Sequence, residues 1–379
     1  MAFDSHARRP PRKPAARTGR ESRSIAARSA RTGFRRAAGI VWLAAVWLIV
    51  PPSSAQNRDS TGPAGTLTPA DKTELAEIFR LKADVGDRVW PGFAKCGIPV
   101  LLYNDDFEFL IGSADPPSPW VKVPDDDSAG APYHRRPRGR VQAFAIEVGG
   151  TWAGSISTLG RMNAKAPFKL PPDFHVVLAL HEMFHAFQAS QAPERFARAL
   201  KVYAAEDRYP FKDKEFAAAW TSEGAALAKG IQAADDVAAA AAAREFLKTR
   251  DERRTKAALA PDLLGFEREL EWLEGLAKYA EIGFYEIAAN LPPGPTVFRY
   301  AVPMLFIQSD YMRLGNGLGA QSGDLRFYLS GMAQARLLDR LSPGWKDKAL
   351  PGPASLEDLI REAVLPGRKK SLQSGSLTL

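Results

Sequence analysis

Two histidines and a glutamate within five positions are the side chains of this sequence best suited to chemistry. Residues 181–185 read His-Glu-Met-Phe-His, so His181 and His185 are four positions apart. On an α-helix such side chains lie one above the other, and both imidazoles can reach one zinc ion at about 2.0–2.1 Å. Glu182 is turned away from the ligand positions and suits a general base acting on the attacking water. The pattern predicts a catalytic Zn²⁺ site.

The residues around this motif bear on whether the histidines are ligands. The helix is apolar on nearly all sides, which predicts that it lies in the interior; its apolar members are Leu178, Ala179, Leu180, Met183, Phe184, Ala186 and Phe187. Burying two histidines and a glutamate costs free energy unless each has a partner. Metal ligation supplies partners, and the alternative interpretation is a pair of histidines satisfied by hydrogen bonds in the core.

A catalytic zinc needs a third protein ligand and keeps one open position. No histidine follows His185, so an acidic residue must supply that ligand. Residues 272–281 read Trp-Leu-Glu-Gly-Leu-Ala-Lys-Tyr-Ala-Glu. This run resembles the segment of gluzincin metallopeptidases, distantly that of the aminopeptidase N catalytic domain, in which Trp-Leu-Asn-Glu-Gly-Phe-Ala contains the glutamate ligand. The resemblance implies Glu274 as the third ligand and a zincin-like metallopeptidase.

The resemblance covers about fifteen residues and extends to the wider gluzincin group only. No Gly-x-Met-Glu-Asn motif of the aminopeptidases precedes the helix. Glu223 is an alternative third ligand, because it stands in a similar Glu-Gly-Ala run closer to His185, and Glu271 is another. Glu271 and Glu281 lie on one helical stripe with Lys278, so either carboxylate could instead hydrogen-bond a ligand histidine from behind. An exposed charged stripe is the other interpretation of this pattern.

A group that stabilises the developing oxyanion is also expected. Tyr328, within Phe-Tyr-Leu-Ser-Gly at the head of a predicted helix, is the favoured candidate. The alternatives are Tyr279, Tyr300, Tyr311 and His175.

The hydrophobic pattern predicts an α+β fold in which a small mixed or antiparallel sheet precedes a mainly helical body. Aromatic and β-branched runs predict strands at 98–103, 107–111, 141–148 and 152–158. Residues 115–140, with six prolines and three consecutive aspartates, predict a long solvated loop. Helices are expected at 71–81, 173–190, 193–205, 213–249 (with a possible break), 264–290, 297–313, 325–341 and 355–364. The expected units are a linker at 56–70, a sheet subdomain at 71–160, a helical catalytic region at 161–365 and a flexible tail at 366–379.

The strand at 152–158 comes just before the histidine-bearing helix. In zincins the strand at this place often forms a sheet edge that can hold an extended peptide through its free N–H and C=O groups. The neighbouring Gly149-Gly150 pair suits a close approach of substrate, and an ordinary hairpin turn is an equally good interpretation.

The first 55 residues predict export. They contain 11 of the 51 lysines and arginines but only 2 of the 43 acidic residues, and residues 37–50 carry no charge. A basic region, a short apolar stretch and small residues at 53–55 are typical of a signal peptide, and 14 apolar residues are too few to span a bilayer easily. The remaining chain has 40 basic and 41 acidic residues, which argues against a nucleic-acid partner.

Together these features predict an exported zinc hydrolase, periplasmic or secreted, that acts on a peptide or protein substrate. A catalytically inactive zincin-like envelope protein, with a structural zinc or a binding role, is the alternative. Membrane contact is expected only through an uncleaved leader.

Cleavage of the leader predicts a mature N-terminus near Gln56, because Ser53 and Ala55 occupy the small-residue positions before that bond. N-terminal sequencing of protein recovered from the cell envelope measures this. An intact arginine-rich leader on most molecules would contradict the prediction.

Overall fold

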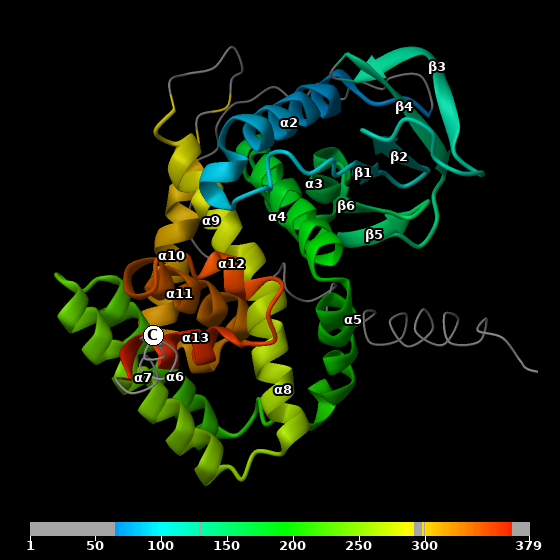
Figure 1. Ribbon diagram of the computed structural model, residues 1–379. Coiled ribbons are helices and arrows are strands. Elements are labelled where there is room, and N and C mark those ends of the chain that lie inside the picture. The colour runs from blue at the N-terminus through cyan, green and yellow to red at the C-terminus, as the bar shows by residue number, and fades with distance from the viewer. Residues whose placement is uncertain (1–64, 129, 292–297, 299, 366–379) are drawn as a thin grey trace, which may run out of the picture.

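The computed structural model describes residues 65–128, 130–291, 298 and 300–365 (Figure 1). The predicted signal peptide, the linker up to residue 64 and the tail at 366–379 lie outside the described residues. In the described part, six strands form one mixed sheet and most other residues are helical, which confirms the α+β class. None of the described helices is both long and apolar enough to cross a membrane.

The sheet has the strand order β3-β4-β2-β1-β6-β5. Its strands are β1 (Val100–Tyr103), β2 (Phe107–Ile111), β3 (Val121–Ser128), β4 (Ala131–Pro137), β5 (Phe144–Val148) and β6 (Thr151–Ser157). β1 and β6 are parallel, and the other neighbours are antiparallel. Both faces of β1 are buried, since Val100 and Leu102 join the main core while Leu101 and Tyr103 join a smaller apolar cluster.

The prediction of a loop across residues 115–140 was wrong, because β3 and β4 form a hairpin there. Proline and aspartate are depleted in strands, so the local sequence argues against β3. Tertiary contacts override that preference. β4 pairs with β2, Asp126 forms an ion pair with Lys72, and the Tyr133 hydroxyl donates to Asp126 at 2.6 Å. A register shift between Lys122 and Asp127 accommodates the irregular part of β3.

The expectation that the strand at 152–158 forms a sheet edge was also wrong. β6 is interior, between β1 and β5, and β5 is the edge strand on this side. Gly149 and Gly150 form the hairpin turn between β5 and β6, with φ angles of 59° and 83°. This left-handed backbone suits a two-residue turn whose twist matches the strands. The sheet edge next to the histidine-bearing helix therefore belongs to β5.

The helices lie on the predicted segments, and the possible break within 213–249 falls between Ile231 and Asp236. They are α2 (Pro69–Val89), α3 (Leu159–Lys165), α4 (Pro172–Gln191), α5 (Pro193–Val202), α6 (Lys214–Ile231), α7 (Asp236–Lys256), α8 (Pro261–Leu270), α9 (Leu276–Ala288), α10 (Ala301–Gly317), α11 (Leu325–Leu341), α12 (Lys346–Ala349) and α13 (Leu356–Val364). Short irregular helices lie at η1 (Tyr203–Arg208), η2 (Glu271–Gly275) and η3 (Leu318–Ala320). α3 and α12 had no counterpart in the sequence-based prediction, and α2 continues eight residues beyond the predicted end.

Helix α4 lies between the sheet and the helical body (Figure 1), and one apolar core runs from one part to the other. Leu75 of α2, Phe109 of β2, Phe184 of α4 and Phe284 of α9 all belong to this core. Burial on every side explains why the sequence of α4 is apolar nearly all round. The boundary between the predicted units at 160/161 stays a prediction.

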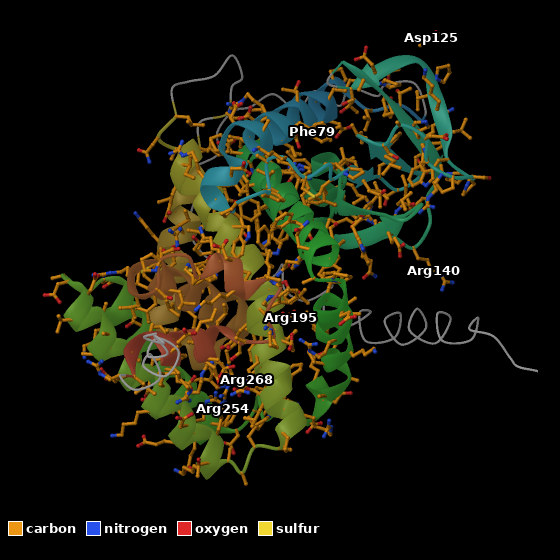
Figure 2. All side chains as sticks on the ribbon, in the orientation of Figure 1. Phe79, Asp125, Arg140, Arg195, Arg254 and Arg268 are labelled. Carbon is orange, nitrogen blue, oxygen red and sulfur yellow. The ribbon has the colours of Figure 1, made fainter. Side chains whose placement is uncertain are left out.

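A buried set of ion pairs joins the helices of the lower part of the molecule, where Figure 2 places Arg254 and Arg268. We call it the Arg–Glu cluster; its members are Arg250, Arg253, Arg254, Arg268, Glu223, Glu267, Glu271 and Glu357. Arg250 alone contacts Glu223 at 2.9 Å, Glu271 at 2.6 Å and Glu357 at 3.1 Å. Four guanidinium groups face four carboxylates, so no member needs to be buried without an opposite charge.

The cluster makes folding stability depend on pH. Burial by itself raises the pKa of Glu267, but Arg253 and Arg254 outweigh it and lower the pKa from 4.5 to about 2. A carboxylate with a lowered folded-state pKa stabilises the protein above its unfolded value, and this contribution disappears as the pH falls from about 4.5 to about 2. We expect Glu267 to contribute about 3 kcal/mol to that loss.

Urea unfolding of the wild type and of Glu267→Gln between pH 6 and pH 3 measures the effect. The variant should be less stable at pH 6 and should lose less stability on acidification. Equal pH dependence in the two proteins would show that Glu267 is not held ionised by the arginines.

Candidate metal centre

Helix α4 carries His181, Glu182 and His185 into the interior, and all three side chains are buried. Strand β6 lies directly against this turn of the helix. A Cβ on Gly154 would stand 2.6 Å from the backbone nitrogen of Met183, which is closer than real Cβ atoms come. Glycine at this position therefore sets how closely the sheet approaches the histidine-bearing turn.

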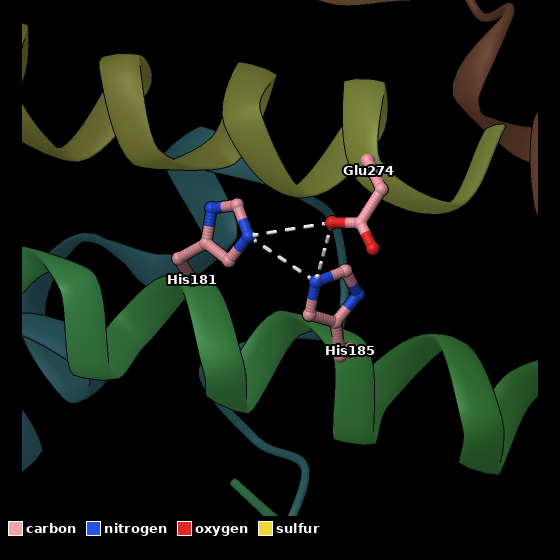
Figure 3. Close-up of side chains that lie close together, drawn as sticks. All are labelled: His181, His185 and Glu274. Atoms are coloured by element: carbon pink, nitrogen blue, oxygen red, sulfur yellow. Dashed lines mark hydrogen bonds and ion pairs between the residues drawn. The ribbon is translucent and has the colours of Figure 1, made fainter. Parts of the chain in front are cut away.

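A π-helical turn directs Glu274 towards the histidines. The turn is η2, which separates α8 from α9 within the single helix predicted at 264–290. Such turns interrupt the regular helical register and are frequent at functional sites. The Glu274 Oε2 atom lies 3.2 Å from Nε2 of His185 and 3.9 Å from Nε2 of His181, and the two Nε2 atoms are 3.2 Å apart (Figure 3). Three ligand-type atoms thus converge on one point.

The triangle of these atoms has the size that a tetrahedral zinc ion requires. Ligand atoms about 2.0–2.1 Å from zinc are separated from one another by about 3.3 Å in that geometry. Glu274 Oε2 is buried and has no hydrogen-bond partner of good geometry, which is costly for a carboxylate oxygen. A divalent cation between the three atoms would remove this cost, so the residues fit a zinc ion.

Both histidines are oriented by contacts at Nδ1, the ring nitrogen that does not face Glu274. Glu281 Oε2 lies 3.0 Å from Nδ1 of His181, and Gln188 Oε1 lies 3.0 Å from Nδ1 of His185. When Nδ1–H donates to these oxygens, Nε2 carries the free lone pair that a metal needs; the tautomers are assigned from these partners. Gln188 also donates to the backbone oxygen of Trp272 at 2.8 Å, which ties α4 to η2.

The two histidines differ in their electrostatic surroundings. Burial lowers the pKa of His181, but contacts with Glu274 and Glu281 outweigh it and raise the pKa to about 10. At His185 burial dominates, and its pKa is lowered. The carboxylates therefore attract positive charge to the space between the three ligand atoms.

Tyr203, which sequence reasoning missed, holds Glu274 in position. Its hydroxyl donates to Glu274 Oε1 at 3.0 Å, while Oε2 faces the histidines. One oxygen is thus engaged and the other is available as a single ligand atom. Tyr203 begins η1, some seventy residues before Glu274, and no local pattern marks it.

Glu182 is buried beside the candidate ligands and is not part of the triangle that they form. Burial raises the pKa of Glu182 to about 8; His181 opposes this rise, and the nearby Glu274 and Glu281 add to it. Among the described residues no side chain donates a hydrogen bond to Glu182, so its oxygens are available to a small molecule. Position and availability both suit a general base.

Tyr328 is brought to the centre from α11. Its ring stacks on His181 with centroids 5.9 Å apart and an interplanar angle of 12°. Burial raises the pKa of Tyr328 well above its usual value, and Glu274 raises it further, so the hydroxyl stays protonated and can donate. Two glycines allow the approach: a Cβ on Gly275 would stand 2.4 Å from Cα of Gly331, one turn after Tyr328.

The alternative oxyanion-stabilising residues have other partners. Tyr279 donates to Asp339 at 2.9 Å, and Tyr300 donates to Glu77 at 2.8 Å. His175 lies between Glu74 and the backbone oxygen of Ser157. Tyr311 has its pKa raised by burial and is influenced mainly by Arg336 and Glu286 rather than by the ligands.

The alternative third ligands lie in the Arg–Glu cluster instead. Glu223 contacts Arg250 at 2.9 Å and Arg253 at 2.5 Å. Glu271 contacts Arg250 at 2.6 Å and accepts a hydrogen bond from Ser330 at 2.6 Å. Of the three candidate glutamates, the structure brings only Glu274 to the histidines. Glu271 likewise does not back a ligand histidine, whereas Glu281 does.

No protein-family model matches the chain, and neither a curated protein nor a solved structure does. The gluzincin resemblance therefore stays a prediction that depends on the residues around 181–185 and 272–281.

Removing Glu274 should abolish tight metal binding, whereas removing Glu223 should not. We expect Glu274→Ala to weaken zinc binding by at least about 100-fold. Replacing a residue that only hydrogen-bonds a metal ligand typically weakens metal binding by about 10–100-fold, and loss of a ligand itself should cost more. Glu223→Ala should lower the free energy of unfolding by about 3–5 kcal/mol, because it leaves buried arginines short of a partner.

Elemental analysis and chelator competition on the folded fraction of each variant measure these outcomes. We expect one zinc per chain in the wild type and in Glu223→Ala. Zinc kept by Glu274→Ala but lost by Glu223→Ala would mean that the ligand comes from α6.

Proposed function

We propose that the protein is a zinc-dependent hydrolase of the gluzincin type, exported from the cell, that cleaves a peptide bond. The observation that carries the proposal is the convergence of His181, His185 and Glu274 on one point, with Glu182 beside them. A structural zinc site is normally closed by four protein ligands, whereas a catalytic site has three and an open position. The described residues offer three, which favours the catalytic interpretation over an inactive zincin-like protein.

Zinc bound at this centre would supply a Lewis acid that polarises a carbonyl group and makes water a stronger acid. Glu182 then acts as the general base. It accepts a proton from the water that attacks the carbonyl carbon and delivers that proton to the leaving nitrogen when the C–N bond breaks. Its buried position favours this double role, because burial raises the pKa of Glu182 and so makes its carboxylate a stronger base.

Tyr328 is proposed to stabilise the oxyanion that forms at the carbonyl oxygen. Its hydroxyl remains protonated, and its ring is fixed against His181. A donor held in place before the reaction costs little reorganisation when charge develops. Tyr203 has a different role in this proposal, because its hydroxyl donates to the Glu274 oxygen that faces away from the histidines.

Strand β5 offers a binding surface for an extended peptide. It pairs with β6 on one side and ends the sheet on the other, so its outward N–H and C=O groups can pair with a substrate strand. Phe144 on β5 lies 4.5 Å, centroid to centroid, from the ring of His185. A peptide added along this edge would therefore pass beside the ligands, which supports a peptide or protein substrate.

Glu182→Gln separates the general base from the metal ligands. The amide keeps the size of the side chain but cannot accept the proton, so hydrolysis should fall by about 10²–10⁴-fold while one zinc per chain remains. Cleavage of a mixed peptide library, followed by mass spectrometry, measures the rate. Glu245→Gln, which alters an exposed glutamate paired with Lys229, is the matched control and should retain full activity. Undiminished cleavage by Glu182→Gln would exclude this role for Glu182.

A further inference from the structure

A buried chain of alternating charges extends from His181 to helix α10. Glu281 Oε2 lies 3.0 Å from Nδ1 of His181, and Glu281 Oε1 lies 2.7 Å from the ammonium of Lys278. The same ammonium lies 2.7 Å from Oδ2 of Asp310 on α10. The side chains of Lys278, Glu281 and Asp310 are 13%, 6% and 8% exposed, so water screens these contacts little.

The two histidines are therefore supported in different ways. Gln188, a neutral amide, accepts from His185, whereas the carboxylate of Glu281 accepts from His181. A buried carboxylate with a single donor is costly and free to rotate. Lys278 engages the second oxygen of Glu281, so that Oε2 remains directed at the imidazole.

The position of Lys278 in the helix connects it to the ligand set. Glu274 near the end of η2 and Lys278 and Glu281 in α9 follow one another at spacings of four and three residues, which places them on one face of this continuous helical segment. This face carries a metal ligand, the cation and the carboxylate behind His181. Asp310 holds the ammonium from the opposite side and comes from a separate helix, so Lys278 is fixed by tertiary contacts rather than by α9 alone.

We propose that Lys278 is a positioning residue for the metal centre, acting through Glu281 to orient His181. The inference rests on the proposed zinc centre. It concerns a residue whose ammonium contacts Glu281 and Asp310 rather than the candidate ligand atoms.

A double-mutant cycle on zinc affinity tests the proposal, because a residue that acts through Glu281 can have no effect once Glu281 is replaced. Zinc dissociation constants are measured by competition with a chromophoric chelator for the wild type, Lys278→Met, Glu281→Gln and the double variant. We expect about tenfold weaker binding for Lys278→Met and about 10–100-fold weaker binding for Glu281→Gln. The double variant should match Glu281→Gln within about threefold.

Two results would overturn the proposal: wild-type affinity in Lys278→Met, or losses that multiply in the double variant as they do for independent structural damage. Lys278→Gln, which retains donors for both carboxylates, is a second variant should Lys278→Met fold poorly, and its loss should be smaller and equally absent in the Glu281→Gln background. Lys82→Met is the matched control. Lys82 is also buried, but its ammonium donates to the backbone oxygens of Ala94 and Cys96, and zinc affinity should not change.

If the wild type binds no zinc, the proposed function fails and the inference fails with it. If the wild type binds zinc tightly and the cycle is additive, only the role of Lys278 is lost.

Discussion

The need to pair every buried carboxylate governs the helical body of this protein. Glu271 and Glu274 belong to the same π-helical turn but meet this need to different extents. Glu271 pairs with Arg250 and accepts from Ser330, and so fixes the turn in the Arg–Glu cluster. Glu274 keeps one oxygen for Tyr203 and directs the other, without a hydrogen bond, at two imidazoles. The charge-balanced Arg–Glu cluster thus anchors the turn from which Glu274 presents an oxygen without a hydrogen bond.

Close backbone approach is the second requirement of the centre. Gly154 brings β6 against the turn of α4 that carries the histidines, and Gly275 and Gly331 bring η2 against α11. These close approaches bring three elements, each with a different group, to one point. α4 supplies imidazoles, η2 the carboxylate and α11 the tyrosine. A side chain larger than hydrogen at these glycines would move whole elements, because the atoms it would meet are backbone atoms that cannot rotate away.

The surroundings of the centre are asymmetric in a way that suits catalysis. On one side, Glu281, Lys278 and Asp310 form an ion-paired chain behind His181. On the other, Glu182 has no hydrogen-bond donor among the described residues, and edge strand β5 passes beside His185 through Phe144. Glu281, Gln188 and Tyr203 each contact one of the three converging residues, whereas the oxygens of Glu182 are left to a small molecule. In enzymes generally, the groups that orient metal ligands are distinct from the groups that react with substrate.

The sequence by itself determined the α+β class, the helix that carries His181, Glu182 and His185, and their common face, because helical spacing is a local property. The run at 272–281 also pointed to Glu274 and to Glu281 behind a histidine. Only the tertiary structure separated Glu274 from Glu223, because both stand in similar Glu-Gly runs and differ in which charges surround them after folding. Tyr203, the β3–β4 hairpin and the identity of the edge strand likewise depended on contacts between segments far apart in the chain, which local propensity does not contain.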